Sequence, residues 1–100
     1  MNIKNKNLLL NGNTKLYFSQ NLDKVKIGED NLTLKIVKFN RWQEESIQVL
    51  YKDILLGYFD GFDYKYLDLI NSNSNYILKL EVADISKEDM CIYVKYYVYN

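Results

Sequence analysis

The chain of 100 residues contains no histidine, no proline, one cysteine and only four glycines. With Cys91 as its sole thiol and no histidine, it can form neither a His/Cys zinc cluster nor an intrachain disulfide. The commonest general base of enzymes is also missing, and the isolated glycines make no phosphate-binding loop. We therefore expect no metal, no cofactor and no catalytic residue, and predict that the protein is not an enzyme. Cys91 is expected to be a small buried hydrophobe.

Long apolar runs are missing as well. Aliphatic runs stop at three residues, as in Leu8-Leu9-Leu10, whereas a membrane span needs about 20. The first four residues precede no apolar segment with a cleavage site, so we expect a cytoplasmic protein without a membrane partner. The composition, 48% hydrophobic and 26% charged, predicts one globular domain over residues 1–100, with residues 1–7 frayed.

Charge is distributed unevenly along the chain. Residues 1–42 carry seven lysines and Arg41 against three acids, a net +5, and residues 43–100 carry five lysines against ten acids, a net −5. Random scatter of surface charge is one interpretation. The other is a basic surface that receives an anionic ligand, made of Lys15, Lys24, Lys26, Lys35, Lys38 and Arg41.

Apolar residues that alternate with polar ones predict a mainly β protein. Asn11-Gly12-Asn13 and Lys52-Asp53 are read as turns. We expect six to seven strands, drawn from residues 8–10, 15–18, 24–27, 32–39, 47–51, 54–59, 76–82 and 91–99. A small barrel or strongly bent sheet is favoured because it removes exposed strand edges.

One segment changes period. Phe62, Tyr66, Leu69 and Ile70 recur at helical spacing and predict one principal helix at about residues 61–71. Asp60-x-x-Asp63 is read as the capped start of this helix rather than as a metal-binding pair.

Aromatic residues are abundant, with ten Tyr, four Phe and one Trp. Flat side chains beside cations suit stacking on unpaired bases, with the cations on phosphates. For the tyrosines of residues 93–99 we expect instead that they wall a core. Trp42 differs because it lies in the polar turn 40–45, where either a surface role or a packing role is open.

The middle of the chain resembles the HIRAN domain, a small OB-like barrel. The family's centre reads Asn-Pro-Tyr-Asp-x-x-Ala-Ile-x-Val and is followed, after a hairpin, by apolar-Gly-Tyr/His-apolar. Here Asn40-Arg41-Trp42-Gln43-Glu44-Glu45-Ser46-Ile47-Gln48-Val49 has the same spacing and precedes Leu56-Gly57-Tyr58-Phe59. The resemblance covers about residues 15–82 and is tight over residues 40–59.

This resemblance implies a domain that holds the 3′ end of single-stranded DNA. The family's stacking aromatic corresponds to Trp42, and its acid, which contacts the terminal hydroxyl, corresponds to Gln43. Arg41 replaces the family's proline, and Leu16-Tyr17-Phe18 lacks the arginine of the family's first strand. The implied nucleic-acid-binding residues are Tyr17, Phe18, Lys38, Asn40, Arg41, Trp42, Gln43 and Tyr58.

Two functions remain open from the sequence. The first is a HIRAN-like domain that binds single-stranded DNA, including its 3′ end, by aromatic stacking and by Lys/Arg contacts to phosphates. The second is a protein-interaction module, such as a phage or mobile-element inhibitor of a host enzyme, because a Tyr- and Trp-rich surface is also a good binding hot spot.

Overall fold

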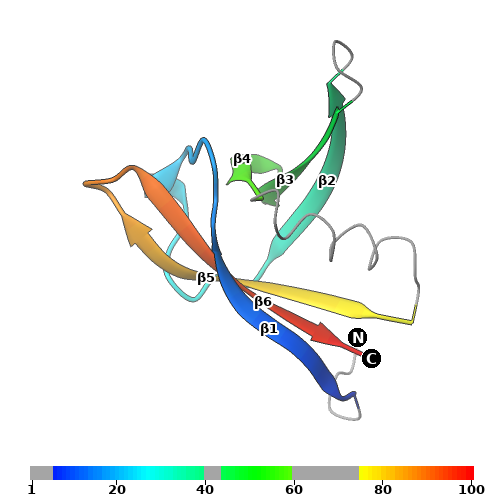
Figure 1. Cartoon of the computed structure of the whole chain (residues 1–100). Coiled ribbons are helices and arrows are strands. Elements are labelled where there is room, and N and C mark those ends of the chain that lie inside the picture. Colours follow the sequence, from blue (N-terminus) through cyan, green and yellow to red (C-terminus); the bar gives the residue numbers. More distant parts are fainter. Residues whose placement is uncertain (1–5, 40–43, 60–74) are drawn as a thin grey trace.

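The computed structural model describes residues 6–39, 44–59 and 75–100 (Figure 1). The described residues form two antiparallel sheets of three strands each, in the orders β1-β6-β5 and β2-β3-β4. The mainly β class is thereby confirmed. The strands are β1 (Leu8–Lys15), β2 (Leu32–Phe39), β3 (Glu44–Tyr51), β4 (Ile54–Tyr58), β5 (Ile77–Ser86) and β6 (Cys91–Tyr99), and a short 3₁₀ helix, η1 (Leu22–Lys24), precedes β2.

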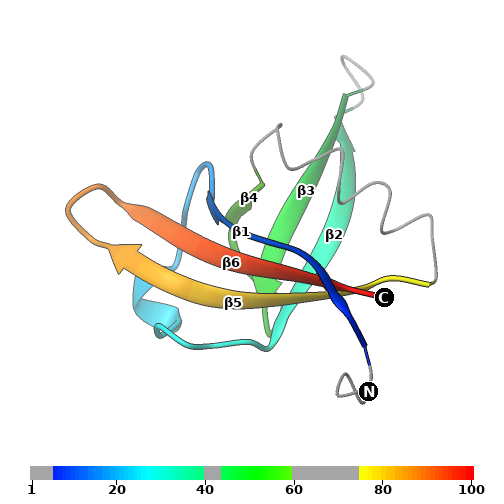
Figure 2. The same cartoon turned by 60° about the horizontal axis from the view of Figure 1, so that its bottom comes forward.

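The strands of the two sheets cross steeply (Figure 2), and backbone hydrogen bonds join the sheets at two seams. At one seam the Gly28 amide donates to the Val82 carbonyl (2.9 Å) and the Val82 amide donates to the Glu29 carbonyl (2.8 Å). At the other seam Tyr17 and Tyr58 form an isolated antiparallel bridge. Among the described residues, the expected barrel is therefore closed by these short pairings between two packed sheets.

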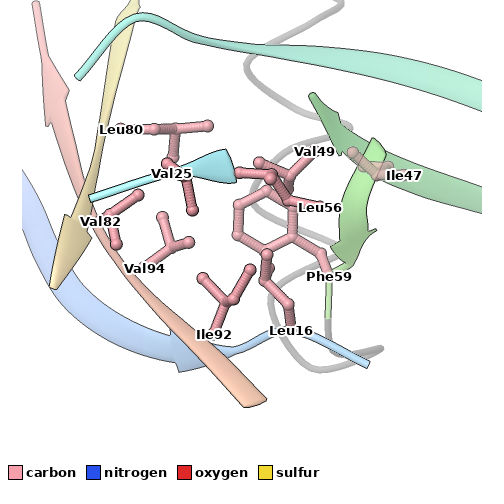
Figure 3. Close-up of a cluster of buried hydrophobic side chains, with 10 residues drawn as sticks. All are labelled: Leu16, Val25, Ile47, Val49, Leu56, Phe59, Leu80, Val82, Ile92 and Val94. Carbon is pink, nitrogen blue, oxygen red and sulfur yellow. The ribbon is translucent and has the colours of Figure 1, made fainter. Parts of the chain in front are cut away.

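The hydrophobic core lies between the sheets (Figure 3). Alternate residues of β3, β5 and β6 point into it, and Leu16 and Val25 enter from the connection between β1 and β2. Each fully buried aliphatic or aromatic side chain stabilises the fold by about 1.5–3 kcal/mol. The buried cluster contains Leu16, Val25, Ile47, Val49, Leu56, Phe59, Leu80, Val82, Ile92 and Val94.

Several expected elements have the observed bounds. Residues 32–39 and 91–99 are β2 and β6, and Lys52-Asp53 is the turn between β3 and β4. The strand expected at residues 76–82 continues to Ser86 as β5. Cys91 is buried, as expected. The helix expected at residues 61–71 falls outside the described residues, as do Asp60 and Asp63.

Three expectations near the N-terminus were wrong. Asn11-Gly12-Asn13 is no turn, because β1 runs through it in register with β6. A Cβ on Gly12 would lie 2.6 Å from the Tyr96 hydroxyl, so this glycine makes room for a neighbouring ring. Residues 15–18 are not a full strand either, since β1 ends at Lys15 and only Tyr17 pairs further. Asn7 is not frayed, because it exchanges backbone hydrogen bonds with Asn100 (3.1 and 3.0 Å).

The strand expected at residues 24–27 is also absent. Asn21 adopts a left-handed conformation (φ 57°) and starts η1, while its side-chain amide donates to the Leu55 carbonyl (2.8 Å). Only Val25 of this segment is buried, and Ile27 remains 62% exposed. The alternation therefore reflects one anchoring residue rather than a strand.

The tyrosines of β6 do not wall the core as a group. Ile92, Val94 and Val98 occupy the core-facing positions of this strand, and Tyr96 packs against the core from the same side. Successive strand residues alternate between the two faces, so the odd-numbered tyrosines lie on the outer face.

No helix among the described residues is long and apolar enough to cross a membrane.

Candidate functional site

A pocket of about 450 Å³ opens beside the Tyr17–Tyr58 seam. Its volume falls in the range of about 300–1,000 Å³ that is typical of small-molecule sites. Aromatic rings make up most of its wall, and two polar side chains complete it. The lining residues are Tyr17, Phe18, Gln20, Ser46, Tyr58 and Phe59.

The chain holds Phe18 outward at the pocket rim. Leu16 is buried as an anchor, whereas Tyr17 is 48% and Phe18 79% exposed. Phe18 has a φ of +53°, a left-handed conformation that costs an L-residue about 1–2 kcal/mol. Such strain in a bulky residue often marks a functional position. An apolar ring presented to solvent at this cost contributes little to folding.

One local and two long-range hydrogen bonds fix the backbone around Phe18. The Ser19 hydroxyl donates to the Leu16 carbonyl (3.0 Å) and accepts from the Ile92 amide (3.0 Å). The Gln20 amide donates to the Leu56 carbonyl (2.8 Å). These bonds tie the segment to both sheets, so the rim of the pocket is held in place.

Gly57 allows the seam to close. A Cβ at this position would lie 2.9 Å from the Leu16 Cβ and 2.9 Å from the Tyr17 carbonyl oxygen, distances that real Cβ atoms do not tolerate against backbone. The sequence Leu56-Gly57-Tyr58-Phe59 thus has a structural cause. The glycine admits the strand extension, Leu56 and Phe59 enter the core, and Tyr58 faces the pocket.

Tyr58 connects the pocket to the outer face of the β2-β3-β4 sheet. Its ring meets the Phe18 ring edge to face, with centroids 6.2 Å apart, and its hydroxyl accepts a hydrogen bond from the Gln48 side-chain amide (3.3 Å). The ring of Tyr58 is therefore oriented from two sides. The edge-to-face arrangement leaves part of each ring face available to a third flat group.

A lysine stands in the same row of this sheet. Lys35 pairs with Gln48 across β2 and β3, and Gln48 pairs with Tyr58 across β3 and β4. Paired residues share a face, and neighbouring strands are about 4.8 Å apart, so the Lys35 and Tyr58 backbones are about 10 Å apart. The exposed Lys35 side chain can therefore serve a ligand that also occupies the pocket.

The residues expected from the sequence fall into two groups. Tyr17, Phe18 and Tyr58 converge on the pocket. Lys38 pairs with Glu45 in the β2–β3 ladder, but its side chain is outside the described part of the chain, as are Asn40, Arg41, Trp42 and Gln43.

Three lining residues were not expected. Ser46 precedes Ile47 in the sequence, and Phe59 follows Tyr58. Because side chains alternate along a strand, Ser46 lies on the face of the sheet opposite to that of the buried Ile47. Gln20 carries no local signal, because its position depends on the distant contact with Leu56.

The charged groups near the end of β1 include one with a shifted pKa. A hydrogen bond to Cys91 is the main cause that raises the pKa of Lys15, and electrostatic interactions with Cys91, Tyr93 and Asp89 add to it. Lys15 is exposed at the end of β1. Lys24, Lys26 and Lys35 are exposed too. Among the described residues no three His, Cys, Asp or Glu side chains gather to hold a metal ion.

Comparison of this chain with protein-family models, curated proteins and solved structures finds no match. The pocket is therefore interpreted from its own geometry.

Proposed function

We propose that the protein binds single-stranded DNA and holds one unpaired base in the pocket between Tyr17, Phe18 and Tyr58. The observation that carries this proposal is Phe18, which is 79% exposed at a φ of +53° beside the Tyr58 ring. A strained, solvent-exposed ring does not stabilise the folded state. A base stacked on such a ring contributes about 1–3 kcal/mol to binding.

The polar lining supports a nucleobase over a purely apolar group. Gln20 offers a carboxamide with donors and an acceptor, and Ser46 offers a hydroxyl, so both can bond the edge of a base. A base inside a duplex keeps its faces stacked and cannot enter the pocket. The chemistry therefore favours single strands.

Two exposed lysines, one on each sheet, can contact phosphates of the same strand. Lys35 stands in register with Gln48 and Tyr58, and Lys15 lies on the strand that leads to Tyr17. A few such contacts give an affinity that is modest and falls as salt rises.

A finer form of the proposal concerns the 3′ end. By the resemblance to HIRAN domains, Trp42 stacks on the terminal base and Gln43 hydrogen-bonds the 3′ hydroxyl, assisted by Asn40, by Arg41 on a phosphate and by Lys38. Residues 40–43 connect β2 to β3, the strand that contributes Ser46 to the pocket. A neutral Gln43 gives a weaker hydrogen bond than the family's carboxylate.

A second function uses the same surface. Exposed aromatic rings around a pocket also form hot spots for a partner protein, which is the role of a phage or mobile-element inhibitor of a host enzyme. The exposure of Phe18 favours this reading as much as it favours stacking on bases. The two functions differ in whether an oligonucleotide binds.

Fluorescence anisotropy with a labelled single-stranded oligonucleotide tests the proposal. Phe18→Ala should weaken binding by about 1–3 kcal/mol. Met90→Ala is a matched control, because Met90 is also apolar, 68% exposed and left-handed (φ 54°) but lies in the β5–β6 turn. If micromolar protein at low salt binds no oligonucleotide, the DNA function is wrong and the protein-interaction function remains.

The 3′-end form has its own test. An oligonucleotide with a free 3′ hydroxyl should bind more tightly than the same oligonucleotide with a 3′ phosphate, and Trp42→Ala should remove the difference. Equal affinity for the two would contradict end recognition while leaving base stacking in place.

A further inference from the structure

The outer face of the β1-β6-β5 sheet carries a row of tyrosines and lysines. The core side of β6 is occupied by Ile92, Val94 and Val98, so alternation places the intervening side chains on the opposite face. These are Tyr93, Lys95, Tyr97 and Tyr99. The pattern of aromatic and cationic residues at two-residue spacing is the chemistry of a stacking platform with phosphate contacts.

β1 widens this row on one side. In the register of the two strands, Lys15 pairs with Tyr93, Asn13 with Lys95 and Asn11 with Tyr97. Lys15, Asn13 and Asn11 are exposed, while Thr14 between them is buried. The outer edge of the row therefore offers a lysine amine and two carboxamides next to the rings.

A groove of about 170 Å³ lies within this surface. It is lined by Asn11, Gly12, Asn13, Lys95 and Tyr97. The Tyr97 and Tyr99 rings are stacked at the end of the row, with centroids 6.5 Å apart and planes inclined by 22°. A further flat ring can stack on such a pair of nearly parallel rings.

The row begins at the pocket. Leu16, Tyr17 and Phe18 follow β1 directly in the chain. The Leu16 amide donates a hydrogen bond to the carbonyl of Ile92 in β6 (2.9 Å). From Tyr17 back to Leu8, which pairs with Tyr99, the chain spans nine steps, or about 30 Å at 3.3 Å per residue. β1 pairs with β6 from Leu8 to Lys15 (Figure 1).

We infer that a single strand of DNA continues from the pocket along the outer face of β1 and β6, with Tyr97 and Tyr99 as a second stacking site and Lys15 and Lys95 on its phosphates. This inference rests on the proposed function and extends it, because it makes the ligand a strand of several nucleotides rather than one base. A length of about 30 Å is consistent with single-strand sites of about 4–16 nucleotides.

Charge decides where the strand lies on this face. The β1–β6 half carries Lys15 and Lys95, whereas β5 brings Glu81 into register with Lys95. Lys79, also on β5, is already paired with Asp30 (3.7 Å). A polyanion is therefore attracted to the β1 side and repelled by the carboxylate of Glu81. An acidic partner protein would meet the same charges, and the oligonucleotide binding described below distinguishes the two ligands.

Binding of oligonucleotides of two lengths tests the inference. Wild-type protein should bind a 3′-hydroxyl oligonucleotide of about 12 nucleotides at least tenfold more tightly than one of about 3 nucleotides. Tyr97→Ala should weaken binding of the longer oligonucleotide about tenfold and leave the shorter one unchanged. Lys95→Glu should also weaken binding of the longer oligonucleotide. It should reduce the slope of log affinity against log salt concentration by about 1, as expected for the loss of one phosphate contact.

Two variants sharpen the result. Glu81→Gln should tighten binding of the longer oligonucleotide, because it removes a negative charge beside Lys95. Lys52→Glu, in the β3–β4 turn, is the charge-matched control and should change neither affinity by more than about twofold. All four side chains are at least partly exposed, so the variants should fold, and circular dichroism checks this.

The outcomes separate this inference from the proposed function. If Tyr97→Ala and Lys95→Glu bind the longer oligonucleotide like wild type while Phe18→Ala does not, the strand does not follow β1 and β6, and the pocket function stands. Equal wild-type affinity for the two lengths also overturns the inference. If wild-type protein binds neither oligonucleotide, the proposed function fails and this inference fails with it.

Discussion

The amide of Tyr17 donates a hydrogen bond to the carbonyl of Tyr58 at 2.7 Å, and the amide of Tyr58 donates back to the carbonyl of Tyr17 at 2.8 Å. This pair closes one seam between the two sheets, and both side chains line the 450 Å³ pocket. Closure of the fold and construction of the site therefore depend on the same two residues. Changes that open the seam should impair both.

Gly57→Ala tests this dependence. The added Cβ would lie 2.9 Å from both Leu16 Cβ and the Tyr17 carbonyl oxygen, so we expect a loss of about 1–3 kcal/mol in the free energy of unfolding, measured by urea denaturation. Gly28→Ala is the control: Gly28 also has a positive φ (+95°), but nothing lies within 4 Å of its Cβ position. A Gly57→Ala protein no less stable than Gly28→Ala would contradict the account of the seam.

Phe18→Gly should separate stability from binding. Glycine relieves the left-handed strain at φ +53°, and this gain offsets the lost ring contact with Tyr58 and the greater entropy of an unfolded glycine. We expect the free energy of unfolding to stay within about 1 kcal/mol of wild type, while oligonucleotide affinity falls as for Phe18→Ala. A large loss of stability would show that Phe18 is held outward for packing reasons.

Lys35→Glu tests the predicted basic surface. Because Lys35 shares a row with Gln48 and Tyr58, the reversal should weaken oligonucleotide binding, and more strongly at about 50 mM salt than at about 200 mM. Lys38→Glu tests in the same way the prediction that Lys38 belongs to this basic surface. Unchanged affinity of Lys35→Glu at low salt would exclude this face as the phosphate contact.

The pKa of Lys15 offers a test that involves no ligand. Hydrogen bonding to Cys91 is the main cause of the raised pKa, so Cys91→Ala should lower the pKa of Lys15 toward its ordinary value, as followed by NMR titration of its side chain. The linked stability is fully present below the unfolded-state pKa and is lost as pH rises through the higher folded-state pKa. An unchanged pKa in Cys91→Ala would show that the interactions with Tyr93 and Asp89 dominate instead.

Local alternation was sufficient for some strands. β2 and β6 were predicted with their observed bounds, since apolar residues recur at every second position over much of each strand. The alternation at residues 24–27 was misleading, because Val25 alone reaches the core and Ile27 stays exposed. Period two indicates a strand only where a neighbouring strand pairs with it.

The structural reasons for two glycines could not be predicted from the local sequence. Gly12 was read as part of a turn, yet it lies within β1 because the Tyr96 ring occupies the space of its side chain. Gly57 was noted as part of a motif, but its reason is the approach of Leu16 and Tyr17 from 40 residues earlier in the chain. Both causes are contacts between residues distant in sequence, which a local pattern does not contain.

The candidate site was partly predictable. Tyr17, Phe18 and Tyr58 were named from the resemblance to HIRAN domains, and the structure brings them to one pocket. Their role as DNA ligands stays a prediction. Gln20 was missed because a hydrogen bond to Leu56 positions it, and the outer tyrosines of β6 were assigned to the core because the sequence alone does not say which face is covered.

The most direct test of the central claim is an NMR titration of ¹⁵N-labelled protein with a single-stranded oligonucleotide of about 3 nucleotides, short enough to occupy the pocket alone. We predict that the backbone amides of Tyr17, Phe18, Gln20, Ser46 and Tyr58 shift together with one binding constant, while those of Lys52 and Asp53 in the opposite turn do not. Shifts confined to residues away from the pocket, or no shift at millimolar oligonucleotide, would contradict the claim that the pocket binds an unpaired base.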